Sequence, residues 1–138
     1  MNQKIKTLVE QSGLKYSITE DGGFFKAVYQ FADGRTQLVF IDTEPDTFEG
    51  TEYADFNIAS PICLESELDP TKALKLLKAM ADTKAGAVKI QSGMVLVNYD
   101  LNPSGVSPSL FGALVNLIAK EADRLEQIVE PNGQKDRF

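Results

Sequence analysis

Residues 69–101 read DPTKALKLLKAMADTKAGAVKIQSGMVLVNYDL, and a helix pattern is followed there by a strand pattern. Asp69 offers a side-chain N-cap and Pro70 suits the first helical position, so a helix is predicted to begin here and to end near Gly86. Its predicted apolar face consists of Ala73, Leu74, Leu77, Met80 and Ala81. A strand hairpin is predicted next, around the turn Ser92-Gly93. Its alternating apolar residues are Val88, Ile90, Val95, Val97, Tyr99 and Leu101.

The same cap-then-proline pattern returns at Ser107-Pro108. It predicts a long amphipathic helix that runs toward Pro131. The apolar residues of this helix are Leu110, Phe111, Leu114, Leu117, Ile118, Leu125, Ile128 and Val129. Residues 131–138 are expected to form a frayed tail.

The first part of the chain predicts one short helix and then a strand meander. Ile5, Leu8 and Val9 recur at helical spacing, and Gly13 stands where a helix commonly ends. Residues 14–18, 25–31 and 56–62 alternate between apolar and polar, with a turn predicted at Asp21-Gly22-Gly23. These three segments are therefore predicted to be strands of an antiparallel sheet.

Two segments between these strands carry other patterns. The apolar run Leu38–Ile41 follows the turn Asp33-Gly34 and suggests a central strand covered on both faces. Residues 42–53 are acidic and contain Pro45 and Gly50, so an exposed loop is expected there. The sequence thus predicts a single α+β domain over residues 1–138, with an antiparallel sheet of about five strands and helices at the start, middle and end.

The charge of the chain narrows the choice of partner. The 14 Lys and Arg residues against 20 Asp and Glu residues give a net charge of −6, which disfavours nucleic acid and anionic membrane surfaces as partners. No apolar run is long enough for a membrane span, and residues 1–10 do not resemble a signal peptide. A cytoplasmic location is therefore expected.

The absence of histidine from the sequence bears on catalysis. It removes the usual general base at neutral pH and the histidine-dependent catalytic triads. The one cysteine, Cys63, stands between Ile62 and Leu64 and is expected to be a buried structural thiol. We therefore expect a protein that is not an enzyme and that uses no cofactor.

The acidic residues between 42 and 55 invite comparison with a metal site. Clustered carboxylates are what Ca²⁺ and Mg²⁺ prefer, but the pattern of a calcium loop fails here. Thr47 stands at the position that requires glycine and Tyr53 at the position of the closing glutamate. A solvated loop is favoured over a metal site.

Three apolar residues are candidates for contact with a partner. Phe24 and Phe25 are adjacent in a predicted strand and must point to opposite faces, so one of them, taken here as Phe24, is expected to leave the core. The cluster of Leu74, Leu76, Leu77 and Met80 spans more than one helix face, so Leu76 is expected to extend beyond the core stripe. We assign Phe24, Leu76 and Met80 as candidate partner-binding residues.

The order of the elements resembles that of type III secretion chaperones and the related YbjN-like proteins. The resemblance covers nearly the whole chain and is carried by the helix from Asp69-Pro70, the hairpin Val88–Leu101 and the final helix from Ser107-Pro108. It implies an acidic homodimer that binds extended segments of a protein partner along apolar patches, partly by adding strands to its sheet, without catalysis.

Two further hypotheses remain open beside this one. A small-ligand protein or carboxylate-based enzyme would use Tyr53 or Tyr99 around a pocket between helix and sheet, and such a pocket must then exist. A regulatory or accessory subunit would need a partner for its own stability. Neither hypothesis predicts a metal or a cofactor.

Overall fold

We describe the protein from a computed structural model, in which residues 3–19, 23–42, 46–54, 56–102 and 104–130 are described. The helices within these ranges are α1 (Gln3–Gln11), η1 (Glu65–Glu67), α2 (Pro70–Ala79), η2 (Met80–Asp82) and α3 (Pro108–Val129). The strands are β1 (Tyr16–Ile18), β2 (Phe24–Gln30), β3 (Thr36–Asp42), β4 (Asp46–Phe48), β5 (Thr51–Ala54), β6 (Phe56–Leu64), β7 (Ala87–Gln91) and β8 (Met94–Leu101). The predicted turn residues Asp21 and Gly22 and the predicted tail 131–138 lie outside the described residues.

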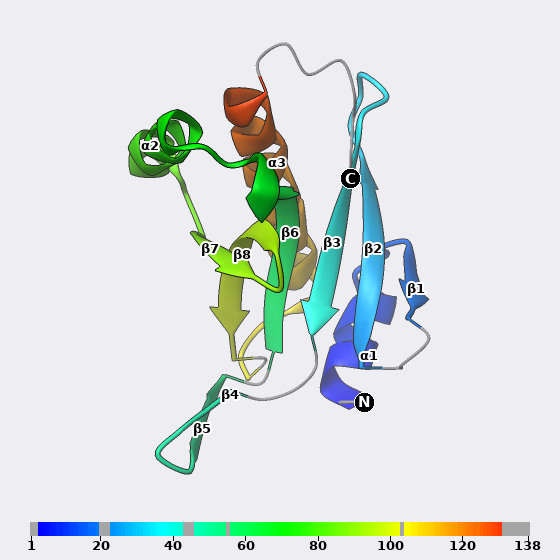
Figure 1. Cartoon of the computed structure of the whole chain (residues 1–138). Helices are drawn as coiled ribbons and strands as arrows, with labels where there is room; N and C mark the ends of the chain where they lie inside the picture. Colours follow the sequence, from blue (N-terminus) through cyan, green and yellow to red (C-terminus); the bar gives the residue numbers. More distant parts are fainter. Residues whose placement is uncertain (1–2, 20–22, 43–45, 55, 103, 131–138) are drawn as a thin grey trace.

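The main sheet has six strands in the order β1-β2-β3-β6-β8-β7, and each neighbouring pair is antiparallel (Figure 1). This confirms the predicted α+β fold with helices at the start, middle and end. The strands β1 and β7 form the two edges of the sheet.

The acidic segment 42–53, predicted to be a loop, contains strand structure instead. β4 and β5 pair as a separate two-stranded hairpin. Its turn residues Glu49 and Gly50 have φ angles of 48° and 79°, and a tight hairpin turn favours positive φ at both central positions. The loop prediction failed because glutamate at the first of these positions is not a recognisable turn signal, whereas the predicted exposure holds for residues 47–51.

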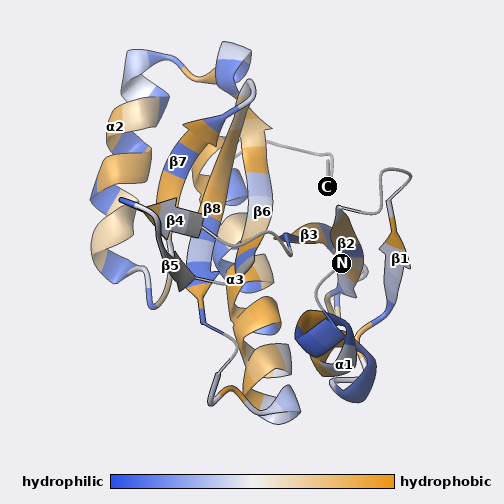
Figure 2. Ribbon diagram, turned by 90° about the horizontal axis from the view of Figure 1, so that it is seen from below, coloured by the Kyte–Doolittle hydropathy of each residue, from blue (hydrophilic) through white to orange (hydrophobic). Residues whose placement is uncertain are grey.

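The helices α1 and α3 cover one face of the sheet, while α2 lies beside the edge strand β7 (Figures 1 and 2). The cap predictions are confirmed, because the Asp69 side chain accepts a hydrogen bond from the Lys72 amide at 2.8 Å and Ser107 Oγ accepts one from the Leu110 amide at 3.1 Å. Such caps satisfy amide groups that the helix itself leaves without partners.

The core lies between α1, α3 and the covered face of the sheet. Its large, fully buried members include Phe25, Phe111, Ile5, Ile41, Ile58, Ile62, Ile118 and Leu125. Cys63 is also buried, as predicted.

The prediction that both faces of the strand from Leu38 to Ile41 are covered is wrong. Val39 and Ile41 are buried in the core, whereas Leu38 and Phe40 are half-buried on the opposite face. The ring of Phe40 packs edge-to-face against Phe24, with ring centroids 5.8 Å apart. The apolar run Leu38–Ile41 therefore places two side chains in the core and two on a second, more accessible apolar face of the sheet.

Candidate functional site: an apolar groove beside an edge strand

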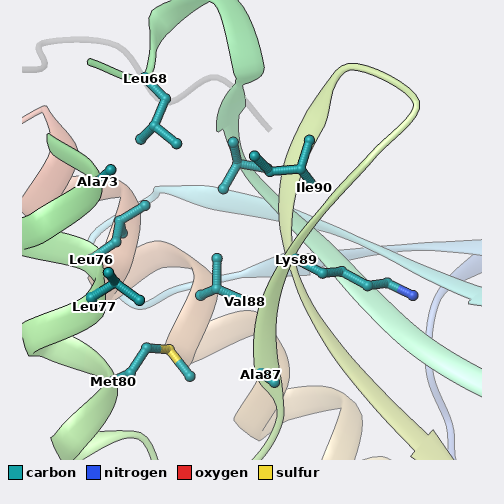
Figure 3. Close-up of a pocket in the computed structure, with 10 residues that line it drawn as sticks. Leu68, Ala73, Leu76, Leu77, Met80, Ala87, Val88, Lys89 and Ile90 are labelled. Atoms are coloured by element: carbon teal, nitrogen blue, oxygen red, sulfur yellow. The ribbon is translucent and has the colours of Figure 1, made fainter. Parts of the chain in front are cut away.

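A groove separates α2 from the edge strand β7 (Figure 3). It encloses about 390 Å³, which falls within the usual range for a binding cavity. Its wall on the α2 side consists of Leu68, Ala73, Leu76, Leu77 and Met80. Its wall on the sheet side consists of Ala87, Val88, Lys89, Ile90 and Val95. Nearly all of this surface is hydrocarbon, so an occupant must be apolar.

Four consecutive residues of β7, from Ala87 to Ile90, line the groove. Successive side chains of a strand point to opposite faces of its sheet, so one face alone cannot contribute all four. The groove must therefore run along the backbone edge of β7. Since β7 is the last strand of the sheet, this edge carries main-chain N–H and C=O groups that no neighbouring strand in the sheet uses.

The side chains of β7 divide as the alternation requires. Val88 pairs with Val97 and Ile90 pairs with Val95, so both belong to the face that also carries the core. Figure 3 shows the Lys89 side chain extending away from α2. The ammonium group of Lys89 is thus outside the apolar part of the groove.

The predicted apolar face of α2 was rotated relative to the observed one. Leu76, expected to leave the core stripe, is 3% exposed, so that expectation is wrong. Leu74 and Leu77, assigned to the stripe, are 52% and 71% exposed. Leucines at positions 74, 76 and 77 fit two helix faces equally well, and only the contact of α2 with α3 and the sheet decides between them.

Polar contacts join both ends of α2 to α3. At the start of α2, Lys72 Nζ donates a hydrogen bond to Glu130 Oε1 at 2.8 Å. This hydrogen bond, with the negative charge of Glu130, raises the pKa of Lys72 above its ordinary value of 10.5. At the other end of α2, Arg124 Nη2 donates to Thr83 Oγ1 at 3.1 Å and contacts the Ala79 carbonyl oxygen at 3.4 Å.

Gly86 allows the chain to pass closely from η2 into β7. Its φ angle is 82°, and a Cβ atom at this position would lie 2.9 Å from Val97 Cγ1 and 3.0 Å from the carbonyl oxygen of Asn98. Only glycine satisfies both the positive φ and the short distances. The end of the groove beside Ala87 thus depends on a residue without a side chain.

The structure brings together two of the three candidate partner-binding residues. Leu76 and Met80 both line the groove, although Leu76 is buried and Met80 is half-buried. Phe24 is half-buried on β2, which is separated from β7 by three strands, and does not line the groove. Leu68 and Ile90 also line the groove but were not assigned from the sequence as candidate partner-binding residues. For Ile90, one signal of this role was present in the sequence, which was its position in the strand that follows α2.

Tyr99, which the small-ligand and enzyme hypothesis named, does not line this groove. Tyr99 is half-buried against the core, and the side chain of Tyr53 lies outside the described residues. Across the described ranges, no group of three or more acidic or cysteine side chains is placed to hold a metal ion. None of the described helices is long and apolar enough to cross a membrane.

Comparison with protein-family models finds no match, and none of the curated proteins searched is significantly similar to the chain. Function is therefore inferred from the geometry of the groove and from the order of the helices and strands.

Proposed function

We propose that this protein is a non-catalytic, chaperone-like module that binds an extended apolar segment of a protein partner in the groove between α2 and β7. One observation carries the proposal: the groove lays open the backbone edge of β7 opposite an apolar helix wall. A segment entering there gains main-chain hydrogen bonds from β7 and buries alternate side chains against Leu77 and Val88.

The order of helices and strands supports the same reading through its resemblance to the secretion chaperones and YbjN-like proteins. The β4–β5 hairpin is an addition to the elements on which that resemblance rests. A homodimer belongs to the proposal as well, and sedimentation over a range of micromolar concentrations tests it.

Exposed leucines on α2 offer a matched pair of variants for the binding test. Leu77 lines the groove and is 71% exposed, whereas Leu74 is 52% exposed on the same helix and does not line the groove. Both replacements, Leu77→Asp and Leu74→Asp, should leave the fold intact because both side chains are largely in solvent.

The probe is a displayed library of short random peptides, selected on the wild-type protein. Selected peptides should alternate apolar residues, and Leu77→Asp should weaken their binding by about tenfold or more while Leu74→Asp leaves it nearly unchanged. Hydrogen exchange should show new protection of β7 amides in the complex. Equal effects of the two variants, or no protection of β7, would refute strand addition in this groove.

A second candidate is a binding site for a small apolar ligand, which the volume and the hydrocarbon walls of the groove favour. Such a ligand fills the groove without forming hydrogen bonds to the β7 backbone. A medium-chain fatty acid that binds more weakly to Leu77→Asp, and that leaves β7 amide exchange unchanged, would support this candidate over the peptide-binding one.

A further inference from the structure

A second pocket lies at the opposite edge of the sheet, on β1. It encloses about 300 Å³ and is lined by Lys15, Tyr16, Ser17, Lys26 and Val28. Three consecutive residues, from Lys15 to Ser17, contribute to it. Ser17 pairs with Lys26, so Lys15, Ser17, Lys26 and Val28 lie together on the uncovered face of the sheet, next to the edge strand β1.

The β1 pocket combines positive charge with exposed apolar surface. Lys15 and Lys26 both line it, in a chain whose net charge is −6. Neither lysine takes part in the ion pairs found among the described residues. Beside them, Tyr16, Ile18 and Val28 are 37%, 49% and 49% exposed. An occupant that suits this edge is an acidic strand that carries an apolar side chain.

The β4–β5 hairpin has this chemistry. The sequence of the hairpin, residues 46–54, has three acidic residues, Asp46, Glu49 and Glu52, and no basic residue. Phe48, the last residue of β4, is 69% exposed, and Glu49 beside it is in the turn. Neither β4 nor β5 pairs with any other described strand, so each has a free edge. A two-stranded hairpin in isolation is only marginally stable, and a third strand would stabilise it.

The hairpin and the β1 pocket lie far apart within one molecule. Figure 1 shows β4 and β5 projecting below the sheet on the β6 side, with β1 at the other edge, and Figure 2 shows the same separation from below. A contact between the two surfaces must therefore form between molecules.

We propose that the β1 pocket is a docking site for the acidic β4–β5 hairpin of a second copy of this chain. The hairpin adds a strand to the β1 edge, the Phe48 ring packs against Val28 on the uncovered face, and the carboxylates of the hairpin lie near Lys15 and Lys26. Complementary charge on the two surfaces selects this pairing and excludes a like-charged one. The site is separate from the peptide-binding groove between α2 and β7, and the inference rests on the homodimer that forms part of the proposed function.

The test is sedimentation velocity at low and at high salt on the wild type and charge-reversed variants. Wild-type protein should associate at low salt and less so at high salt. The double variant Lys15→Glu, Lys26→Glu should associate about tenfold more weakly or worse, and so should Phe48→Ser. The double variant Lys75→Glu, Lys120→Glu, which reverses two exposed charges on α2 and α3, is the matched control and should associate as the wild type does.

A mixing experiment makes the assignment specific. The variant Glu49→Lys, Glu52→Lys should fail to associate alone but should associate with the Lys15→Glu, Lys26→Glu variant, because the exchanged charges again complement each other. Circular dichroism confirms that each variant is folded before mixing.

The proposal would be overturned if the wild type is a monomer at all concentrations, or if mixing the two charge-reversed variants does not restore association. It would also be overturned if Leu77→Asp abolishes association and the lysine variants leave association unchanged. The last outcome would place the contact in the α2–β7 groove. Peptide binding to that groove is measured separately and needs no self-association, so failure of the peptide-binding proposal is distinguishable from failure of this contact. Association that the lysine variants leave unchanged would keep the homodimer and refute only this contact.

Discussion

Arg124 Nη2 of α3 lies 3.4 Å from the main-chain oxygen of Ala79, the last residue of α2. The same guanidinium donates to Glu121 Oε2 at 2.7 Å, and Glu121 is almost completely buried. One side chain thus neutralises a buried carboxylate and holds the end of α2 beside α3.

Arg124→Met should therefore destabilise the protein by about 1 to 3 kcal/mol, because Glu121 is left buried without its cation. Urea unfolding measures this change. The double variant Arg124→Met, Glu121→Gln should regain part of the loss, since it removes the buried charge as well. If the double variant is as unstable as the single one, loss of the ion pair is not the cause of the destabilisation.

Gly86→Ala should cost about 2 to 4 kcal/mol of unfolding free energy, because the added Cβ is strained at positive φ and meets Val97 and the Asn98 carbonyl oxygen. Gly93→Ala is the control, as Gly93 has a similar φ of 78° but no atom within 4 Å of the added Cβ. That variant should lose only about 1 kcal/mol. Equal losses would show that close packing at Gly86 contributes nothing.

The ion pair between Lys72 and Glu130 should make stability depend on alkaline pH. The pKa of Lys72 is raised in the folded state by its hydrogen bond to Glu130, so the stabilisation is fully present below the unfolded value near 10.5. It is lost as the pH rises through the folded value. The difference in urea midpoint between wild type and Lys72→Met should thus be constant near neutral pH and shrink above pH 10.5.

The control for this pH effect is Glu130→Gln, in which Lys72 remains but its charged partner is removed. In that background the Lys72→Met replacement should have little effect at any pH. A difference in midpoint that persists unchanged to the highest pH would contradict the assignment.

Cys63 should resist thiol reagents in the folded protein, because its side chain, on β6, belongs to the core and is only 1% exposed. A chromogenic disulfide reagent should react with it slowly in buffer and rapidly in urea. The native rate should rise in step with unfolding when destabilising variants such as Gly86→Ala are compared. Fast reaction of the folded wild type would show that the thiol is accessible.

The elements that could be predicted have strong local causes. Asp69-Pro70 and Ser107-Pro108 mark helix starts because the cap and the proline act within one turn. The alternation in Val95 and Val97 marks a strand because its period needs no distant contact. The hairpin at Glu49-Gly50 escaped prediction because its turn uses a residue that rarely adopts positive φ.

The candidate site was harder to predict than the elements that form it. The leucines of α2 were recognised, but their exposure depends on which side of α2 faces α3. The acidic residues Glu121, Asp123 and Glu126 of α3 are buried although their charge suggests a solvent face. Asp123 is buried because Arg35, 88 positions earlier in the chain, donates two hydrogen bonds to its Oδ1 atom.

By itself, the sequence determined the fold class, the caps, the strand segments of the main sheet and the acidic balance of this protein, because composition, local periodicity and local hydrogen bonding produce them. The tertiary structure decided which strands form the edges of the sheet, which face of α2 is buried, and that an apolar groove and a lysine-lined pocket border those edges. These features arise from strand order and from contacts between residues distant in the chain, on which local patterns carry no information.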